Sequence, residues 1–245
     1  FDLFTKGLQE RGLRPLLVNL TDEVDPENSV RMLRAYSVDA VIVASSTLPE
    51  SFAEGFHTTG VPVVHSFGRH VANPKVNVLG IDNIEAGRLA AQTLIARGYT
   101  RVGFMGGPKS ATSAQDRYKG FLDEMSLHTG VELTASFADG YSFEAGRAEM
   151  QKILKGTPSE AYFCGDDVLS IGALSAITEA GLNVPGDIGI IGLNDMEMSG
   201  WQNINLTTIH QPVQQIINSS LELIVAMLDD PNRYPEARLF PCHVV

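Results

Sequence analysis

The sequence is poor in cysteine and contains no apolar run of membrane-spanning length. Its two cysteines among 245 residues, Cys164 and Cys242, are too few for a disulfide framework. Both lie in apolar segments typical of buried strands, which favours free thiols in a reducing compartment. No apolar segment approaches the ~20 residues of a membrane span, and the first residues do not resemble a secretory signal. We therefore expect a soluble, cytoplasmic protein with no membrane contact.

Positive charge is also scarce. The chain has 18 Lys and Arg residues against 29 Asp and Glu residues, so its formal net charge is −11. Affinity for nucleic acid depends on Lys and Arg side chains that displace counterions from the phosphate backbone. If the protein binds DNA, we expect another segment to make that contact.

Sequence motifs for catalysis, metals and cofactors are missing as well. The segment FMGGPKSATS follows a strand-like run, but Pro108 precedes Lys109 where a phosphate-binding loop needs glycine, and proline has no amide to offer. There is no G-x-G-x-x-G, H-E-x-x-H, C-x-x-C or G-x-S-x-G motif. We expect no cofactor, no metal and no enzyme, and turnover of a bound sugar would revive an enzymatic interpretation.

Strand-length apolar runs alternate with amphipathic helical stretches. Because the strand runs are continuously apolar, both faces of each strand should be buried, which is typical of a parallel sheet covered by helices. This pattern predicts a doubly wound α/β architecture, with a division near Ile81 where a turn-rich stretch ends. The apolar runs are 15–20, 39–45, 61–67, 101–107, 160–165 and 187–193, and the helical stretches include 1–12, 26–37, 83–98, 113–127, 143–156 and 167–181.

Polar residues follow several of these strands directly. Asp166 and Asp167 come after one strand, and Asn194 and Asp195 come after another. Such residues are good N-caps for the next helix, which is a purely structural explanation. However, the carboxyl ends of parallel strands share one edge of a sheet, where α/β proteins bind ligands. The repetition therefore indicates a binding site.

Three further residues are suited to such a site. Ser113 and Arg117 are four residues apart and share a helix face. The planar guanidinium of Arg117 matches the hydroxyls of a sugar or a carboxylate, although an exposed helical Arg is more often a solvated surface residue. Tyr141 follows a probable strand, and its ring is suited either to cover an apolar ligand face or to pack half-buried.

The sequence resembles the effector-binding core of lactose/galactose-repressor family transcription regulators over nearly its whole length. The resemblance rests on the following segments in this order: GIDNIEAGRLAAQTLIARGYTRV, VGFMGGP, SAQDRYKGF, YFCGDDVLSIGALSAITEAGLNVPGDIGIIGLND and LTTIHQP. It implies two similar doubly wound parallel-sheet lobes, related to periplasmic binding proteins of type I and joined by three crossovers. The implied N-terminal lobe is 1–81 plus 210–239, and the implied C-terminal lobe is 82–209 plus 240–245. By the resemblance, a DNA-binding headpiece, a hinge helix and the first core strand are absent from the sequence given.

The resemblance also assigns ligand-binding positions. Asp166 stands where Asn is common and Asn194 where Asp is common, so the effector is not fixed by the family. Phe67 or Gly68 replaces an acidic residue, and Ala111 replaces an arginine of purine-responsive relatives, which disfavours a purine. The implied ligand-binding residues are Phe1, Ser113, Arg117, Tyr141, Asp166, Asn194 and Gln211.

The resemblance implies a ligand-responsive transcription regulator. Its partners would be a small-molecule effector, in our reading a sugar, operator DNA bound through the missing headpiece, and a second copy in a homodimer. The helix over 212–228 would take part in the dimer, although its apolar residues suit a lobe core equally well. A periplasmic sugar-binding protein of a transporter is the alternative, and the LTTIHQP segment favours the regulator.

Overall fold

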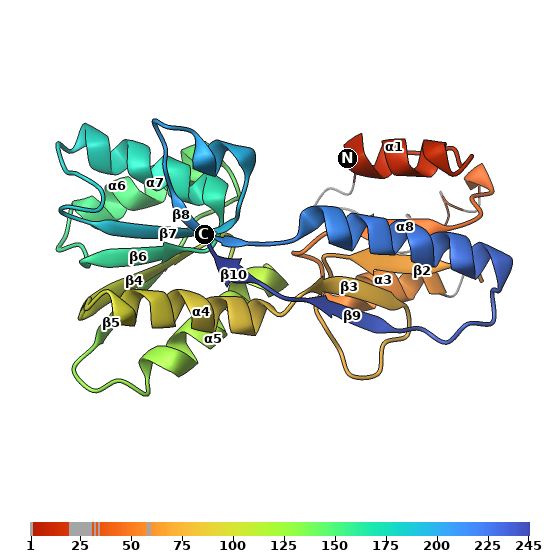
Figure 1. Cartoon of the computed structure of the whole chain (residues 1–245), viewed down its shortest axis with the longest axis horizontal. Helices are drawn as coiled ribbons and strands as arrows, with labels where there is room; N and C mark the ends of the chain where they lie inside the picture. The colour runs from red at the N-terminus through yellow and green to blue at the C-terminus, as the bar shows by residue number, and fades with distance from the viewer. Residues whose placement is uncertain (1, 20–30, 32, 34, 58–59) are drawn as a thin grey trace. The chain divides into compact units, whose positions relative to one another are not determined.

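A computed structural model describes residues 2–19, 31, 33, 35–57 and 60–245. The chain divides into two compact units, Phe1–Ile81 with Pro212–Phe240 and Asp82–Gln211 with Pro241–Val245, so it passes between them three times (Figure 1). Phe1, one of the predicted ligand-binding residues, lies outside the described residues, as does most of the helix predicted over 26–37.

The first unit contains a four-stranded parallel sheet. Its strand order is β1-β2-β3-β9, with β1 at Val41–Ala44, β2 at Val63–Ser66, β3 at Asn77–Ile81 and β9 at Ala237–Phe240. All residues of β2 and β3 are buried, including the polar residues His65, Ser66 and Asn77. Within the described ranges, the helices of this unit include α1 (Asp2–Glu10), α3 (Glu50–His57) and α8 (Val213–Asp229).

Helix α8 contributes to the core of this unit, as the structural alternative for residues 212–228 requires. Ile217 and Leu221 of α8 pack in one buried cluster with Phe4 of α1. Within the same unit, Ser66 at the end of β2 donates a hydrogen bond to Ser220 of α8 at 2.7 Å. The apolar face of α8 is thus largely used inside its own unit.

One predicted strand is wrong. The apolar run over 15–20 forms no strand among its described residues, 15–19. Leu16 and Leu17 are 50% and 60% exposed, and β1 has β2 as its only strand partner in the described sheet. An apolar run becomes a strand only where a neighbouring backbone supplies the ladder of hydrogen bonds, and Leu16 and Leu17 have none in the described residues.

The second unit contains a six-stranded sheet of order β10-β8-β7-β6-β4-β5, in which only β10 is antiparallel. Its strands are β4 (Arg101–Gly106), β5 (Glu132–Phe137), β6 (Ala161–Cys164), β7 (Gly189–Asn194), β8 (Thr207–His210) and β10 (His243–Val244). Its helices are α4 (Asn83–Ala96), α5 (Thr112–Met125), α6 (Phe143–Leu154), α7 (Asp167–Glu179) and the short 3-10 helix η1 (Glu197–Gly200).

Helices cover both faces of this second sheet, with α4 and α5 on one face and α6 and α7 on the other (Figure 1). This is the doubly wound arrangement that the alternation of strands and helices predicts, and the predicted fold class is confirmed. None of the helices within the described ranges is both long and apolar enough to cross a membrane.

Helices α4 and α5 approach each other closely at two glycines. A β-carbon on Gly120 of α5 would lie 1.8 Å from the carbonyl oxygen of Ile84, and one on Gly87 of α4 would lie 2.1 Å from the carbonyl oxygen of Arg117. Only residues without a side chain permit these backbone contacts. The position of α5, and therefore of Arg117, depends on them.

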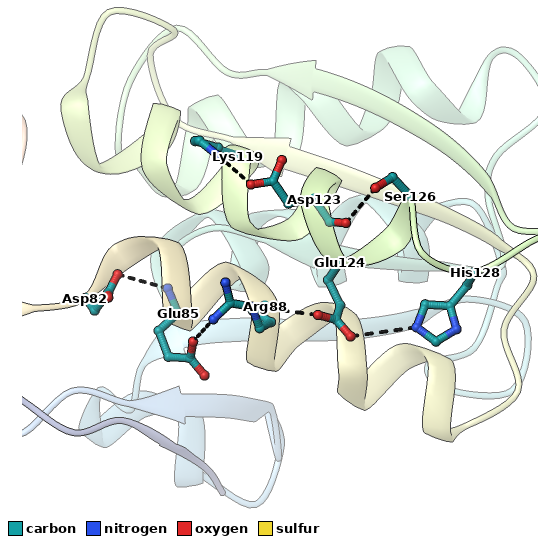
Figure 2. Close-up of polar contacts among 8 residues, drawn as sticks. All are labelled: Asp82, Glu85, Arg88, Lys119, Asp123, Glu124, Ser126 and His128. Atoms are coloured by element: carbon teal, nitrogen blue, oxygen red, sulfur yellow. Dashed lines mark hydrogen bonds and ion pairs between the residues drawn. The ribbon is translucent and has the colours of Figure 1, made fainter.

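Polar side chains of α4 and α5 also contact one another (Figure 2). Asp82 caps α4 by accepting hydrogen bonds from the backbone amides of Ile84 and Glu85. Arg88 forms ion pairs with Glu85 on its own helix and, at 3.7 Å, with Glu124 of α5. The Arg88–Glu85 pair is exposed and contributes little to stability.

Replacing Gly120 with alanine should push α5 away from α4. We expect G120A to lower the free energy of unfolding by about 2 kcal/mol, because the new methyl group meets a backbone carbonyl that has no room to move. G156A is the matched control, because its nearest heavy atom would lie at an ordinary 3.6 Å. Urea unfolding of both variants checks the prediction, and equal stability of the two would contradict it.

His65 on β2 is a fully buried histidine. Its Nε2 lies 3.0 Å from the carbonyl oxygen of Ser45, and among the described residues its Nδ1 has no hydrogen-bond partner. A carbonyl oxygen only accepts, so Nε2 carries the proton. Burial lowers the pKa of His65, opposed in part by the bond to Ser45. The first unit therefore buries a neutral imidazole.

The buried imidazole predicts a pH-dependent stability. Since its pKa is lower in the folded chain, the unfolded chain binds the proton more tightly, and stability falls as the pH drops below about 6.5. The slope from this one group is at most about 1.4 kcal/mol per pH unit. H65F should remove this component of the slope, whereas H70F, at an exposed position, should keep it. Urea unfolding between pH 5 and pH 7 measures the slopes, and identical slopes in H65F and the unmodified chain would refute the assignment.

Candidate functional site

The carboxyl ends of neighbouring strands in the second unit carry the predicted polar residues. Strands β4, β6 and β7 are parallel and adjacent in the order β7-β6-β4. Asp166 follows β6, and Asn194 is the last residue of β7. Helix α5, which contains Ser113 and Arg117, follows β4. All of these groups therefore reach the same edge of one sheet.

Arg117 is buried, contrary to the expectation for a solvated helical arginine. Its side chain is only 3% exposed, its Nε donates to Asn83 Oδ1 at 2.8 Å, and its Nη1 donates to the carbonyl oxygen of Gly165 at 2.6 Å. These partners come from the start of α4 and the end of β6. A buried guanidinium must be paired to offset its desolvation. Two of its five N–H groups are accounted for by these bonds.

Asp166 and Asn194 contact each other directly. Asp166 Oδ2 accepts a hydrogen bond from Asn194 Nδ2 at 2.8 Å, while its Oδ1 accepts one from the backbone amide of Val168 and caps α7. Burial raises the pKa of Asp166, and the nearby positive charge of Arg117 is the largest effect that opposes the rise. Asp166 is thus both an N-cap and a member of the polar cluster, so the two interpretations are compatible.

Ser113 and Tyr141 form a second contact. Their hydroxyl oxygens are 3.2 Å apart, and either group is able to donate. The ring of Tyr141 lies against Gly107, where a β-carbon would come within 2.4 Å of the ring. Tyr141 is half-buried, whereas Ser113 is almost completely buried. Because Ser113 and Arg117 are one turn apart on α5, this contact lies one helical turn from the arginine.

Gln211 is placed by its backbone beside Asn194. Its amide donates a long hydrogen bond to the Asn194 carbonyl oxygen at 3.5 Å, and its side chain is buried. Arg117, Asp166 and Asn194 thus form one cluster with Gln211 adjacent in the backbone, and Ser113 with Tyr141 forms a separate pair.

Asp167, directly after Asp166, serves the structure. It is fully buried; its Oδ1 accepts from the Thr208 hydroxyl at 2.6 Å and its Oδ2 from the Met196 amide at 2.8 Å. Burial raises the pKa of Asp167, and these two hydrogen bonds oppose the rise. The carboxylate therefore connects the start of α7 to β8 and to the segment after β7.

Two residues that accept hydrogen bonds from Arg117 were not identified from the sequence. Asn83 accepts the Arg117 Nε hydrogen bond, and Gly165 offers its backbone carbonyl. The motif GIDNIEAG contains Asn83, but its helix-capping neighbour Asp82 is an equally good candidate by composition. A backbone acceptor such as that of Gly165 leaves no signature in residue identity.

Side chains able to hold a metal ion are not gathered in the described part of the chain. No set of three or more His, Cys, Asp or Glu side chains there is arranged to hold a metal ion. Burial raises the pKa of the Cys164 thiol to about 12 and that of Cys242 to about 11, so neither is a thiolate nucleophile at neutral pH.

The chain thus has two units built on mainly parallel sheets, three passages of the chain between them, and a polar cluster at the strand ends of the second unit. Residues 91–245 match the model of the periplasmic binding protein-like domain family. The chain is 31% identical over 221 residues to the transcriptional repressor PurR of Actinobacillus pleuropneumoniae, covering 88% of this chain and 65% of the repressor. It is 26% identical over 245 residues to the transcriptional regulator CelR of Thermobifida fusca, covering 98% of this chain and 71% of that regulator.

Among solved structures, a complex of the transcriptional regulator CelR with cellobiose superposes with a TM-score of 0.86 at 24% identity, covering 99% of this chain and 75% of that one. The chain belongs to the periplasmic binding protein-like family and, within it, to the effector-binding cores of the lactose/galactose-repressor family. It spans 65% to 71% of the length of the two curated relatives named above.

The structural role of Asp167 predicts a stability loss on substitution. In D167A the Thr208 hydroxyl and the Met196 amide lose their buried acceptor, so we expect the free energy of unfolding to fall by about 3 kcal/mol. D123A is the control, because Asp123 pairs with Lys119 on the exposed face of α5 (Figure 2). Chemical unfolding of both variants provides the measurement, and a D167A variant as stable as D123A would show that these bonds contribute nothing.

Proposed function

We propose that this chain is the effector-binding and dimerisation core of a ligand-responsive transcription regulator. Family membership supports the class, and the cluster of Arg117, Asp166 and Asn194 is the single observation that carries the ligand-binding role. The curated relatives are named as transcriptional regulators, which favours this function over sugar delivery to a transporter. No enzymatic role is proposed.

The effector we propose is a sugar or a sugar derivative. The positive charge of Arg117 and the carboxylate of Asp166 offset each other, so the cluster has donors and acceptors with little net charge. This combination suits the hydroxyl groups of a neutral sugar. The guanidinium is able to donate hydrogen bonds to them, and the Asn194 amide is able both to donate and to accept hydrogen bonds. The ring of Tyr141 adds an apolar surface at one side. The CelR complex with cellobiose supports the same ligand class.

In this proposal Ser113, Arg117, Tyr141, Asp166, Asn194 and Gln211 of the second unit contribute to the effector site, and the role of Phe1 stays a prediction of the resemblance. The effector acts by binding one conformation of the chain more tightly than another, because a ligand shifts an equilibrium only by its differential affinity. The resemblance implies crossovers at 81/82, 209/210 and 239/240, whereas the chain passes between the units at 81/82, 211/212 and 240/241; these three passages would accommodate that change.

The remaining partners follow from the family. We propose that the full-length protein is a cytoplasmic homodimer that binds operator DNA through an N-terminal helix-turn-helix headpiece. The net charge of −11 on this core supports that division, because a surface of this sign does not attract the DNA backbone.

Arg117 also stabilises the fold, so its test needs two variants. Because Arg117 is buried and makes two hydrogen bonds, we expect R117A to lose stability. N194A removes one amide from the cluster and leaves the Asp166 cap in place, so it reports on the site with less damage to the fold.

A thermal-shift screen of mono- and disaccharides, including cellobiose, should identify a sugar that raises the melting temperature of the unmodified chain. For that sugar, we expect calorimetry to show a dissociation constant about 30-fold higher in N194A, the equivalent of about 2 kcal/mol, and no measurable binding in R117A.

The control is R147A, which breaks an exposed ion pair with Glu179 on the α6–α7 face of the same unit. This variant should bind the sugar as the unmodified chain does. If N194A binds the sugar with unchanged affinity, and R117A is folded and also binds it with unchanged affinity, the cluster is not part of the effector site.

A further inference from the structure

The end of β7 has an unusual backbone. Asn194 has a φ of 128° and Asp195 a φ of 56°, so two consecutive residues with side chains lie in the region that favours glycine. Asn and Asp tolerate this region better than other residues, but the conformation still persists only where surrounding contacts enforce it. Such backbone strain concentrates at functional sites.

The contacts that hold this turn come from two directions. On one side Asn194 Nδ2 donates to Asp166 Oδ2. On the other side Asp195 is held by β8, because its amide donates to Thr208 Oγ1 at 3.4 Å and its Oδ2 lies 2.8 Å from His210 Nδ1. A carboxylate oxygen only accepts, so His210 Nδ1 is the donor. The bond to His210 is the shorter of the two and involves a charged acceptor, which makes it the stronger.

His210 is also placed where β8 leaves the second unit. It is the register partner of Asn194 in the β7–β8 ladder and the last residue of β8. The next residue, Gln211, donates its amide to the Asn194 carbonyl, and the chain enters the first unit at Pro212. The ring of His243 on β10 lies over the His210 ring, with centroids 4.9 Å apart. The Asp195 carboxylate is therefore tied to the strand that carries the crossover.

We propose that Asp195 and His210 form a positioning pair that holds Asn194 in its left-handed conformation and so directs its side-chain amide into the polar cluster. The pair also connects this amide to the crossover at Gln211 and Pro212. A ligand that engages Asn194 thereby acts on the residue pair that fixes β8 at its exit from the unit. This inference rests on the proposed function, in which Asn194 is an effector contact.

The left-handed backbone supplies a specific test. H210A removes the donor and leaves Asp195 strained, so Asn194 should lose its fixed orientation. In the double variant H210A/D195G the residue at 195 adopts a positive φ without any support, because glycine has no β-carbon. The double variant should therefore restore the position of Asn194. If His210 acted only through packing, glycine at position 195 would not restore the position of Asn194 in the H210A background.

The measurement is the side-chain amide signal of Asn194 in nitrogen-15 NMR spectra of the whole chain, identified by its disappearance in N194D. In H210A we expect its protons to exchange with water roughly tenfold faster, as for the loss of one charge-assisted hydrogen bond. In H210A/D195G the exchange should return close to that of the unmodified chain. H243A is the matched control, because it removes the neighbouring tilted ring and keeps the Asp195–His210 contact.

The proposal is overturned if the Asn194 signal is unchanged in H210A, or if the double variant fails to restore it. Sugar titrations of the unmodified chain are read separately. If cellobiose and D-ribose both leave the Asn194 signal unmoved, that result counts against an effector contact at Asn194. The comparison of H210A with H210A/D195G still decides whether the pair positions Asn194, since it requires no ligand.

Discussion

Burial of a guanidinium is the constraint on which the second unit depends most. A charge removed from water needs hydrogen-bond acceptors and an opposite charge nearby. For Arg117 these come from the start of α4, the end of β6 and the carboxylate of Asp166. Three separate elements must therefore be in place before this side chain is stable. The same arrangement leaves polar groups gathered at one sheet edge, so a requirement of folding and a capacity for binding coincide.

The neighbouring carboxylates after β6 show how one dipeptide serves both purposes. Asp166 caps α7 and contacts Asn194. Both carboxylate oxygens of Asp167 instead accept hydrogen bonds, one from the Thr208 hydroxyl and one from the Met196 amide. Successive residues at the start of a helix point in different directions, so adjacent identical side chains meet different surroundings. A capping role and a place in the polar cluster are therefore compatible for Asp166.

The sequence predicted most of the second unit because its signals are local. The apolar runs at β4, β6 and β7 and the helices between them lie where periodicity places them, and Asp166 follows its strand as expected. The same reasoning failed at Leu16 and Leu17, because strand formation depends on a partner that periodicity does not report. It also did not foresee the burial of Arg117 or the part of Asn83, since both arise from the backbone approach of α4 and α5 at Gly87 and Gly120. The ligand-binding assignment came from resemblance rather than from periodicity.

The three passages of the chain between units have a consequence for its synthesis. By the time Gln211 leaves the ribosome, every helix and all strands but β10 of the second unit have been made, so this unit is able to fold early. The first unit has to wait, because β3 pairs with β9, with Val78 opposite Ala237, and Ser66 bonds to Ser220. Until α8 and β9 emerge, the nascent chain carries an unfinished parallel sheet whose edge at β3 is open to other strands. The demand on chaperones during translation should therefore fall on the first unit, whose synthesis begins before that of the second unit and ends after most of it.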